Sequence, residues 1–229
     1  YFFDRELRIL IFDKIEKIEI DVRSSIVNHM SLKYGSHWYE DKKIFKEWYN
    51  HAKLIISITE LISKSREVFI KHYNNKYTSP KRPPAWMVFE LLTFGQIFRI
   101  YKALPNKDRK IIAGIYGLHP RIFESWLLTI NVTRNICAHH SRLWNRVLGV
   151  KPLFPTKGNK IEAVDFKNER LYSILFIIKY FLNIITPSSN FKNQIIELLE
   201  TAPFKPTYSI GLPKNWKDDP IWRNPKKPY

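Results

Sequence analysis

The chain has 229 residues, of which 45% are hydrophobic, 15% are aromatic and only seven are glycine. This composition excludes a disordered chain and predicts a helical protein with one well-packed core. The formal net charge of +17 favours a polyanionic partner, either a nucleic acid or an anionic membrane surface, although a lysine-rich proteome also explains part of the surplus.

Two long amphipathic helices are predicted in the N-terminal part of the chain. Apolar residues recur every three to four positions from Phe3 to Ile26, which is the spacing of one helix face, and Gly35 is a suitable stop. A second helix is expected from about His51 to Tyr77. The positions of this helix expected to face inward are Leu54, Ile58, Leu61, Ile62, Val68 and Phe69.

Proline residues delimit the central part of the chain. Residues 78–84 carry three prolines and must form a loop. Residues 85–104 are predicted to be helical, followed by a short helix that Asn106 caps and that stops at Gly117. Pro120 suits the first turn of the next helix. The tryptophans of this region expected in the core are Trp86 and Trp126.

The C-terminal part is predicted to hold two further helices. Residues 150–160 are typical of a loop, residues 165–185 of a helix, and Ser188 caps a last helix that ends near Glu200. The most apolar run, residues 171–185, is too short to span a bilayer, so we expect no membrane segment.

The pattern as a whole predicts an all-α bundle, because neither a convincing strand nor an internal repeat is visible. We expect a helical domain over residues 1–202. A Pro-rich, Trp-containing extension over residues 203–229 follows it. We expect this tail to be extended and either packed by its Trp216 and Trp222 or partly disordered.

Residues 133–146 hold the densest set of chemically active side chains. Three arginines, two histidines and two asparagines occur in this segment, without a single Asp or Glu. Histidine moves protons near neutral pH, and arginine binds phosphate oxygens through a planar fork. This set suits metal-free chemistry on a phosphodiester better than metal-assisted hydrolysis, so no catalytic metal is expected.

On a continuous helix, these side chains would follow one line. Asn135 and His139 lie four positions apart and share a face, which Arg142 and Arg146 would extend. Arg134 and His139 are five positions apart, about 140° around an ideal helix. Either the helix ends near the motif, or the site is a groove filled from two sides.

The segment resembles a known family. Arg134, four intervening residues and His139 match the R-x4-H motif of the HEPN superfamily, and the string through Arg146 resembles the Abi-like family of bacterial phage-resistance proteins of the AbiD/AbiF type. The resemblance spans roughly residues 1–155. The upstream blocks that carry it are residues 3–8 leading into 15–19, residues 86–95 and residues 125–127.

The resemblance implies a HEPN-like bundle with additional helices, acting as a cytoplasmic antiphage effector. The expected reaction is RNA cleavage by internal transfer without metal or cofactor. His139 would act as acid or base, Arg134 would stabilise the charge on the phosphorane, and Asn135 would orient His139 or hold the substrate. The resemblance also implies a homodimer whose two motifs face one cleft, and a small structured inhibitory RNA as a partner.

Other assignments stay open at this stage. His140 competes with His139 as the acting histidine. Arg142, Asn145 and Arg146 bind substrate, take part in catalysis or build the dimer interface. The apolar side chains expected to anchor that interface are Leu143 and Trp144. The alternative functions are a non-catalytic RNA-binding or regulatory module and a purely structural helical partner.

The remaining open residue is Cys137, the only cysteine of the chain. A single cysteine excludes an intrachain disulfide and a cysteine-based zinc cluster, and it fits a reducing cytoplasm. Its position inside the motif allows a catalytic thiol. The competing interpretation, which is the commoner one for a free cysteine, is a small buried hydrophobic residue.

Overall fold

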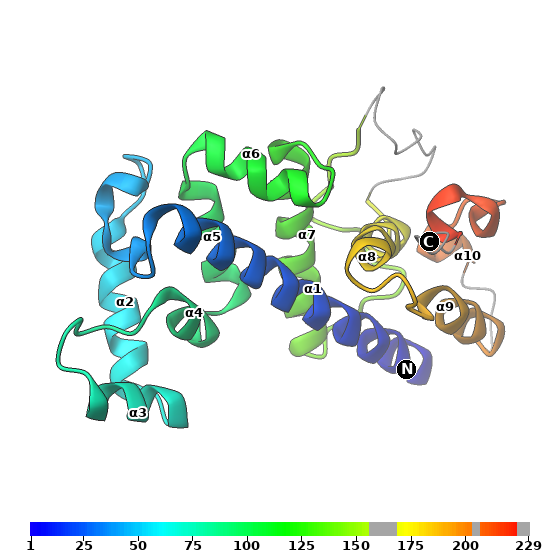
Figure 1. The fold of residues 1–229 in the computed structure, drawn as a ribbon. Helices are drawn as coiled ribbons and strands as arrows, with labels where there is room; N and C mark the ends of the chain where they lie inside the picture. Colours follow the sequence, from blue (N-terminus) through cyan, green and yellow to red (C-terminus); the bar gives the residue numbers. More distant parts are fainter. Residues whose placement is uncertain (156–168, 203–206, 224–229) are drawn as a thin grey trace. The chain divides into compact units, whose positions relative to one another are not determined.

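The computed structural model describes residues 1–155, 169–202 and 207–223. Every regular element of these residues is a helix, so the all-α prediction is confirmed (Figure 1). The longer elements are α1 (Phe2–Tyr34), α2 (His51–Lys64), α3 (Val68–Lys76), α5 (Phe94–Ala103), α6 (Asn106–Ile115), α7 (Pro120–Ala138), α8 (Leu171–Ile185) and α9 (Phe191–Glu200). The short ones are α4 (Ala85–Val88), α10 (Thr207–Ile210) and the 3₁₀ turns η1 (Trp38–Glu40), η2 (Lys42–Ile44), η3 (Phe89–Leu91), η4 (Trp216–Asp218) and η5 (Pro220–Trp222).

The chain divides into two compact units. Unit 1 consists of residues 1–19 and 121–229, and unit 2 of residues 20–120. Helix α1 contributes its first half to unit 1 and its second half to unit 2. The predicted division into residues 1–202 and 203–229 stays a prediction.

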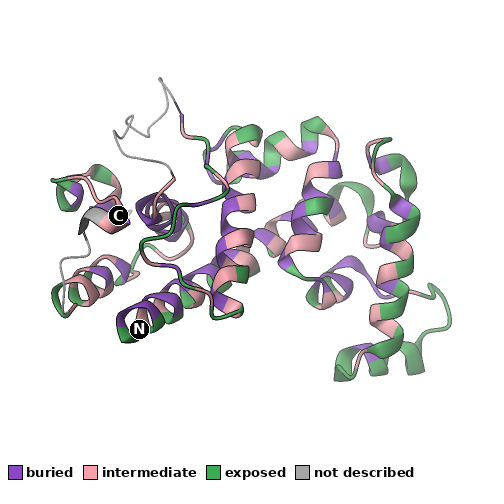
Figure 2. Cartoon of the chain, turned by 180° about the vertical axis from the view of Figure 1, so that it is seen from behind, coloured by how far each residue is buried: buried purple, intermediate pink, exposed green. Residues whose placement is uncertain are grey.

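Unit 1 is built around α8, which is buried along most of its length (Figure 2). The indole of Trp126 on α7 packs edge-on against Phe176 and Phe181 of α8, with ring centroids 6.4 and 6.0 Å apart. Trp126 is fully buried, as predicted.

Among the described residues, no helix is long and apolar enough to cross a membrane.

The tail contributes its tryptophans to this core. Trp222 is fully buried, donates an indole N–H to the Tyr172 hydroxyl at 3.0 Å and packs edge-on against Trp216 at 4.9 Å. The prediction that Trp216 and Trp222 pack the tail against the helices is confirmed. The described part of the tail forms short helical turns instead of the extended backbone that we expected.

Unit 2 has a polar centre between the second half of α1 and α6. Asp108 is fully buried, and its carboxylate accepts hydrogen bonds from His29 at 2.8 Å, Lys33 at 2.7 Å and Tyr34 at 2.9 Å. Burial opposes ionisation of Asp108, but the hydrogen bonds, led by the one from Lys33, outweigh it and lower its pKa. The stop of α1 at Gly35 (φ 88°) is as predicted.

The long helix expected after His51 is wrong, because the chain breaks between α2 and α3. The Ser65 hydroxyl accepts a hydrogen bond from the backbone N–H two residues later, at 3.2 Å, and this local bond competes with the helix. The break resets the helical phase, so Ile70 is buried while Val68 is 80% exposed and Phe69 is 36% exposed. The inward positions predicted for Val68 and Phe69 are therefore wrong.

The helix expected over residues 85–104 is also interrupted. Thr93 caps α5: its hydroxyl accepts from the Gln96 backbone at 3.3 Å, and the Gln96 side chain accepts from the Thr93 backbone at 2.9 Å. Trp86 lies in the four-residue helix α4 before this break and is 53% exposed, so its predicted place in the core is wrong.

Two predicted caps are wrong as well. Asn106 is the first residue of α6, and Pro105 holds the capping position before it. Helix α9 begins at Phe191, so Ser188 does not cap it. The helix predicted over 165–185 begins only at residue 171, and residues 165–168, like 156–160 of the predicted loop, lie outside the described residues.

Candidate functional site

The motif lies at the C-terminal end of α7. The helix begins at Pro120, as predicted, and ends at Ala138, one residue before His139. His140 has a φ of 54°, the left-handed conformation that usually requires glycine after a helix. The His140 backbone N–H donates to the Cys137 carbonyl at 3.1 Å, and the Ser141 backbone N–H donates to the Ile136 carbonyl at 3.0 Å. These two bonds close a Schellman turn and end the helix inside the motif.

The end of the helix corrects one prediction and selects between two others. Arg142 and Arg146 lie beyond the helix, so the predicted polar line along one face stops at His139. The alternative in which the helix ends near the motif is the one found. Asn135 and His139 still lie one turn apart, since the His139 N–H donates to the Asn135 carbonyl at 3.0 Å.

Arg134 contacts the first half of α1, which belongs to the same unit. Its Nε lies 3.5 Å from Glu19 Oε1, and its guanidinium lies over the Phe12 ring at 5.7 Å. The Arg134 side chain is 38% exposed, so the ion pair with Glu19 contributes little and an incoming phosphate can compete for the guanidinium. Arg134 is thus held near its site without being buried.

The side chains of Asn135 and His139 are exposed. Within the described residues, neither side chain makes a hydrogen bond, so the structure does not show Asn135 orienting His139. His140 is also exposed. The two histidines therefore offer free imidazoles to solvent on the turn that ends α7.

A buried ion pair on α1 fixes the loop that follows the motif. Asp4 Oδ1 accepts hydrogen bonds from the backbone N–H groups of Leu143 at 2.9 Å and Trp144 at 2.7 Å, and its other oxygen pairs with the Arg8 guanidinium. The side chains of Asp4 and Arg8 are only 10% and 9% exposed. We call this arrangement the Asp4 clamp.

Burial contradicts the prediction that Leu143 anchors a dimer, whereas the prediction for Trp144 stays a prediction. Leu143 is fully buried inside its own chain, and Trp144 is half-buried with its ring edge-on to Phe3 at 6.1 Å. These side chains pack the loop onto α1. The Asp4 clamp was missed in the sequence, where Asp4 and Arg8 are simply an oppositely charged pair one helical turn apart.

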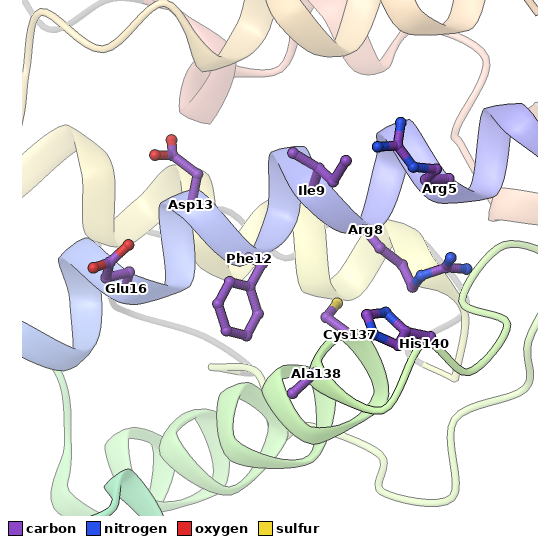
Figure 3. A pocket seen from close by; sticks show the side chains of 9 residues that line it. All are labelled: Arg5, Arg8, Ile9, Phe12, Asp13, Glu16, Cys137, Ala138 and His140. Carbon is purple, nitrogen blue, oxygen red and sulfur yellow. The ribbon is translucent and has the colours of Figure 1, made fainter.

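A pocket of about 580 Å³ lies between the first half of α1 and the end of α7, both in unit 1 (Figure 3). Its lining residues are Arg5, Arg8, Ile9, Phe12, Asp13, Glu16, Cys137, Ala138 and His140. The Arg8 guanidinium, the His140 ring and Cys137 all belong to this lining (Figure 3). Along α1 the lining changes from Arg5 and Arg8 to Asp13 and Glu16, but Arg8 is paired with Asp4 and Asp13 with Lys14, so these charges are already partly neutralised.

The remaining candidates are not gathered in this pocket. Among the candidate motif residues, His140 alone lines it in the described structure. Arg134 does not line the pocket, but its guanidinium lies over the ring of the lining residue Phe12. Arg146 donates to the Arg142 carbonyl at 3.1 Å, both side chains being exposed. Asn145 has a φ of 53° and is exposed.

Cys137 is buried, and burial raises the pKa of its thiol to about 12. A thiol held neutral in this way is a poor nucleophile, so the interpretation as a small buried hydrophobic residue is confirmed and the catalytic thiol is disfavoured. Among the described residues, no group of three or more His, Cys, Asp or Glu side chains is placed to hold a metal ion.

Comparison with known proteins adds one finding. The sequence model of the family described as Abi-like protein matches residues 1–145. The match therefore takes in α1 with the Asp4 clamp, all of α7 and the motif turn through Asn145. No characterised protein and no solved structure matches the chain significantly.

Proposed function

Because the chain belongs to the Abi-like family, whose membership suggests a role in abortive-infection defence, we propose that it is a metal-independent endoribonuclease effector. The observation that carries the proposal is that Arg134, 38% exposed, and the exposed His139 both lie at the end of α7, where the adjacent Ala138 and His140 line a pocket. Histidine and arginine in this setting serve proton transfer and phosphate binding, which RNA cleavage requires.

The proposed reaction is an internal transfer on a phosphodiester. A histidine removes the proton from the ribose 2′-OH, the 2′ oxygen bonds to phosphorus, and the bond from phosphorus to the 5′ oxygen breaks. A second proton donor protonates that leaving oxygen, so the products are a 2′,3′-cyclic phosphate and a 5′-hydroxyl. Acid–base help of this kind contributes about 10²–10⁴-fold. Arg134 leaves Glu19 and binds the phosphorane, where negative charge develops.

The reaction needs both an acid and a base, and the proposal includes a homodimer. Of the two adjacent histidines, His140 lines the pocket and His139 does not, so in the proposal a second copy of the motif supplies the missing partner across a twofold axis. The apolar anchors of that dimer must lie elsewhere than Leu143, which is buried.

Mixing Arg134→Ala chains with His139→Ala chains tests the shared site. Cleavage above either variant alone supports it, and a monomer that cleaves RNA contradicts it.

The first experiment is to incubate the protein with total RNA in EDTA and to sequence the new ends. We expect cleavage that leaves 2′,3′-cyclic phosphates. Activity that is lost in EDTA and restored by Mg²⁺ or Mn²⁺ would require a metal mechanism instead. The exposed His72 and Arg66 of unit 2 provide matched controls, because His72→Ala and Arg66→Ala remove the same side-chain types far from the motif in sequence.

One observation favours a second function, RNA binding without cleavage. Arg134 is paired with Glu19, and within the described residues no side-chain hydrogen bond orients Asn135 or His139. Binding RNA does not need an oriented histidine, whereas acid–base catalysis does. Salt-dependent RNA binding without cleavage, under all metal and pH conditions, would establish this non-catalytic module. A small structured RNA that blocks binding is the expected inhibitor in either case.

A further inference from the structure

Unit 2 contains a pocket that the motif does not touch. It lies on the second half of α1 and the beginning of α4, with a volume of about 470 Å³, which is within the range of small-molecule sites. Its lining residues are Ser24, Val27, Asn28, Ser31, Leu32, Ser36 and Trp86.

Local structure holds these residues in one place. The α1 residues of the lining recur at the spacing of a single helix face. The left-handed turn at Gly35 ends the helix just before Ser36. The Ser36 carbonyl accepts a hydrogen bond from the Ala85 backbone at 2.7 Å, and this bond fixes the start of α4 and thereby Trp86.

The chemistry of the lining is neutral, polar and aromatic. The lining contains no ionisable side chain, although 26% of the chain is charged. The hydroxyl oxygen of Ser31 is buried and has no hydrogen-bond partner among the described residues, and a ligand can satisfy it once the side chain rotates about its Cα–Cβ bond toward the pocket. Asn28 is exposed and offers an amide donor and an amide acceptor together. Trp86 is 53% exposed, although Ala85 and Val88 of the same helix are buried.

We propose that this pocket binds a nucleobase, which stacks on the Trp86 indole and hydrogen-bonds through its edge to Asn28 and Ser31. A base is planar and uncharged, and it carries donors and acceptors on one edge, which matches a lining of this type. A phosphate or a carboxylate finds no cation in this lining. The phosphates attached to the base remain outside the pocket, on a unit in which Lys and Arg outnumber Asp and Glu.

The base has two sources, a free nucleotide or a single-stranded nucleic acid, and the choice of probes separates them. The probes are uridine and adenosine, their 5′-monophosphates, ribose 5-phosphate as a control without a base, and a 2′-O-methylated hexauridylate that cannot be cleaved. Binding to the full chain is measured by ligand-observed NMR for the small probes and by calorimetry for the oligonucleotide.

The variants are Trp86→Ala and Ser31→Ala, with Trp48→Ala as the matched control, since Trp48 is another exposed tryptophan of unit 2, 62% exposed and outside the pocket lining. We expect Trp86→Ala to weaken base binding about 5- to 150-fold, the range for loss of one stacking platform. Ser31→Ala should weaken it about 2- to 12-fold without lowering the melting temperature, because the hydroxyl has no partner to lose.

Each outcome decides the proposal. Binding of nucleosides or mononucleotides assigns a free nucleotide, and binding of the oligonucleotide alone assigns a strand; both support a base pocket when Trp86→Ala weakens them. Equal binding by Trp86→Ala and Trp48→Ala, equal binding of ribose 5-phosphate, or binding of none of the base-containing probes would overturn it. The result is independent of the nuclease proposal, since every readout is binding and every probe survives intact.

Discussion

Replacing Asp4 by alanine is expected to destabilise unit 1 strongly. The carboxylate is 90% shielded from solvent with the Arg8 guanidinium beside it, and it accepts two backbone hydrogen bonds from the loop after the motif. Removing one partner of a buried, hydrogen-bonded ion pair costs about 3–5 kcal/mol, because the remaining charge is left unpaired. For a chain of this size, that loss corresponds to a melting temperature about 6–20 °C lower.

The size of the effect is tested against two comparisons. Asp4→Asn keeps an oxygen for the Leu143 and Trp144 amides but loses the charged oxygen that pairs with Arg8, so we expect about half of the loss. Asp13→Ala removes a carboxylate from the same helix that is 52% exposed and pairs with Lys14, and it should cost about 0–1 kcal/mol. Urea denaturation measures all three free energies of unfolding.

A double-mutant cycle shows whether the charges act together. If the clamp is one unit, Arg8→Met and Asp4→Ala are each costly, and the double variant costs clearly less than their sum. An Asp4→Ala protein as stable as Asp13→Ala would refute the reasoning, because the loop would then be held by packing alone. Additive losses in the cycle would refute the pairing of Asp4 with Arg8.

Three further predictions concern buried titratable groups. Lys179 is fully buried, has no hydrogen-bond partner among the described residues, and has a pKa lowered from 10.5 by burial. Lys179→Met should therefore raise the free energy of unfolding by about 1–3 kcal/mol at pH 7. Wild-type stability should rise as pH approaches 10.5, where the unfolded state also loses the proton, and urea titrations of Lys179→Met should lack this rise. Because the pKa of Asp108 is lowered, its ionised carboxylate stabilises the fold above pH 3.8, and this stabilisation is lost as the pH falls below that value. Asp108→Asn should therefore make the melting temperature fall less steeply with decreasing pH, and an unchanged acid dependence would contradict the assignment. Cys137 should resist alkylation at pH 8 in the native protein and react after unfolding, because burial raises its pKa to about 12; rapid native labelling would show an accessible thiol.

Periodicity predicted the helices well where apolar residues decide the structure. The stripe from Phe3 to Ile26 gave α1, and Gly35 and Pro120 marked a stop and a start, because glycine and proline restrict the backbone directly. The breaks at Ser65 and Thr93 were missed. At both points a side-chain oxygen bonds to a nearby backbone N–H, and this competition does not change the hydrophobic pattern.

The candidate site was only partly predictable for a related reason. The residue types of the motif pointed to phosphodiester chemistry, but not to where the helix ends, since His140 takes a left-handed conformation that sequence patterns assign to glycine. The Asp4 clamp joins residues more than a hundred positions apart. The fold alone brings the Glu19 carboxylate to Arg134, whereas the motif segment itself contains no carboxylate.

The most direct test of the central claim is an RNA cleavage assay in EDTA with Arg134→Ala, His139→Ala and His140→Ala beside the His72→Ala control. The proposal predicts that Arg134→Ala and His139→Ala lower cleavage at least about 100-fold, while circular dichroism and melting temperature stay unchanged, since both side chains are partly or fully exposed. Loss only in His140→Ala would move the acid–base role to the histidine that lines the pocket. Full cleavage by a folded His139→Ala, His140→Ala double variant would contradict the proposed function.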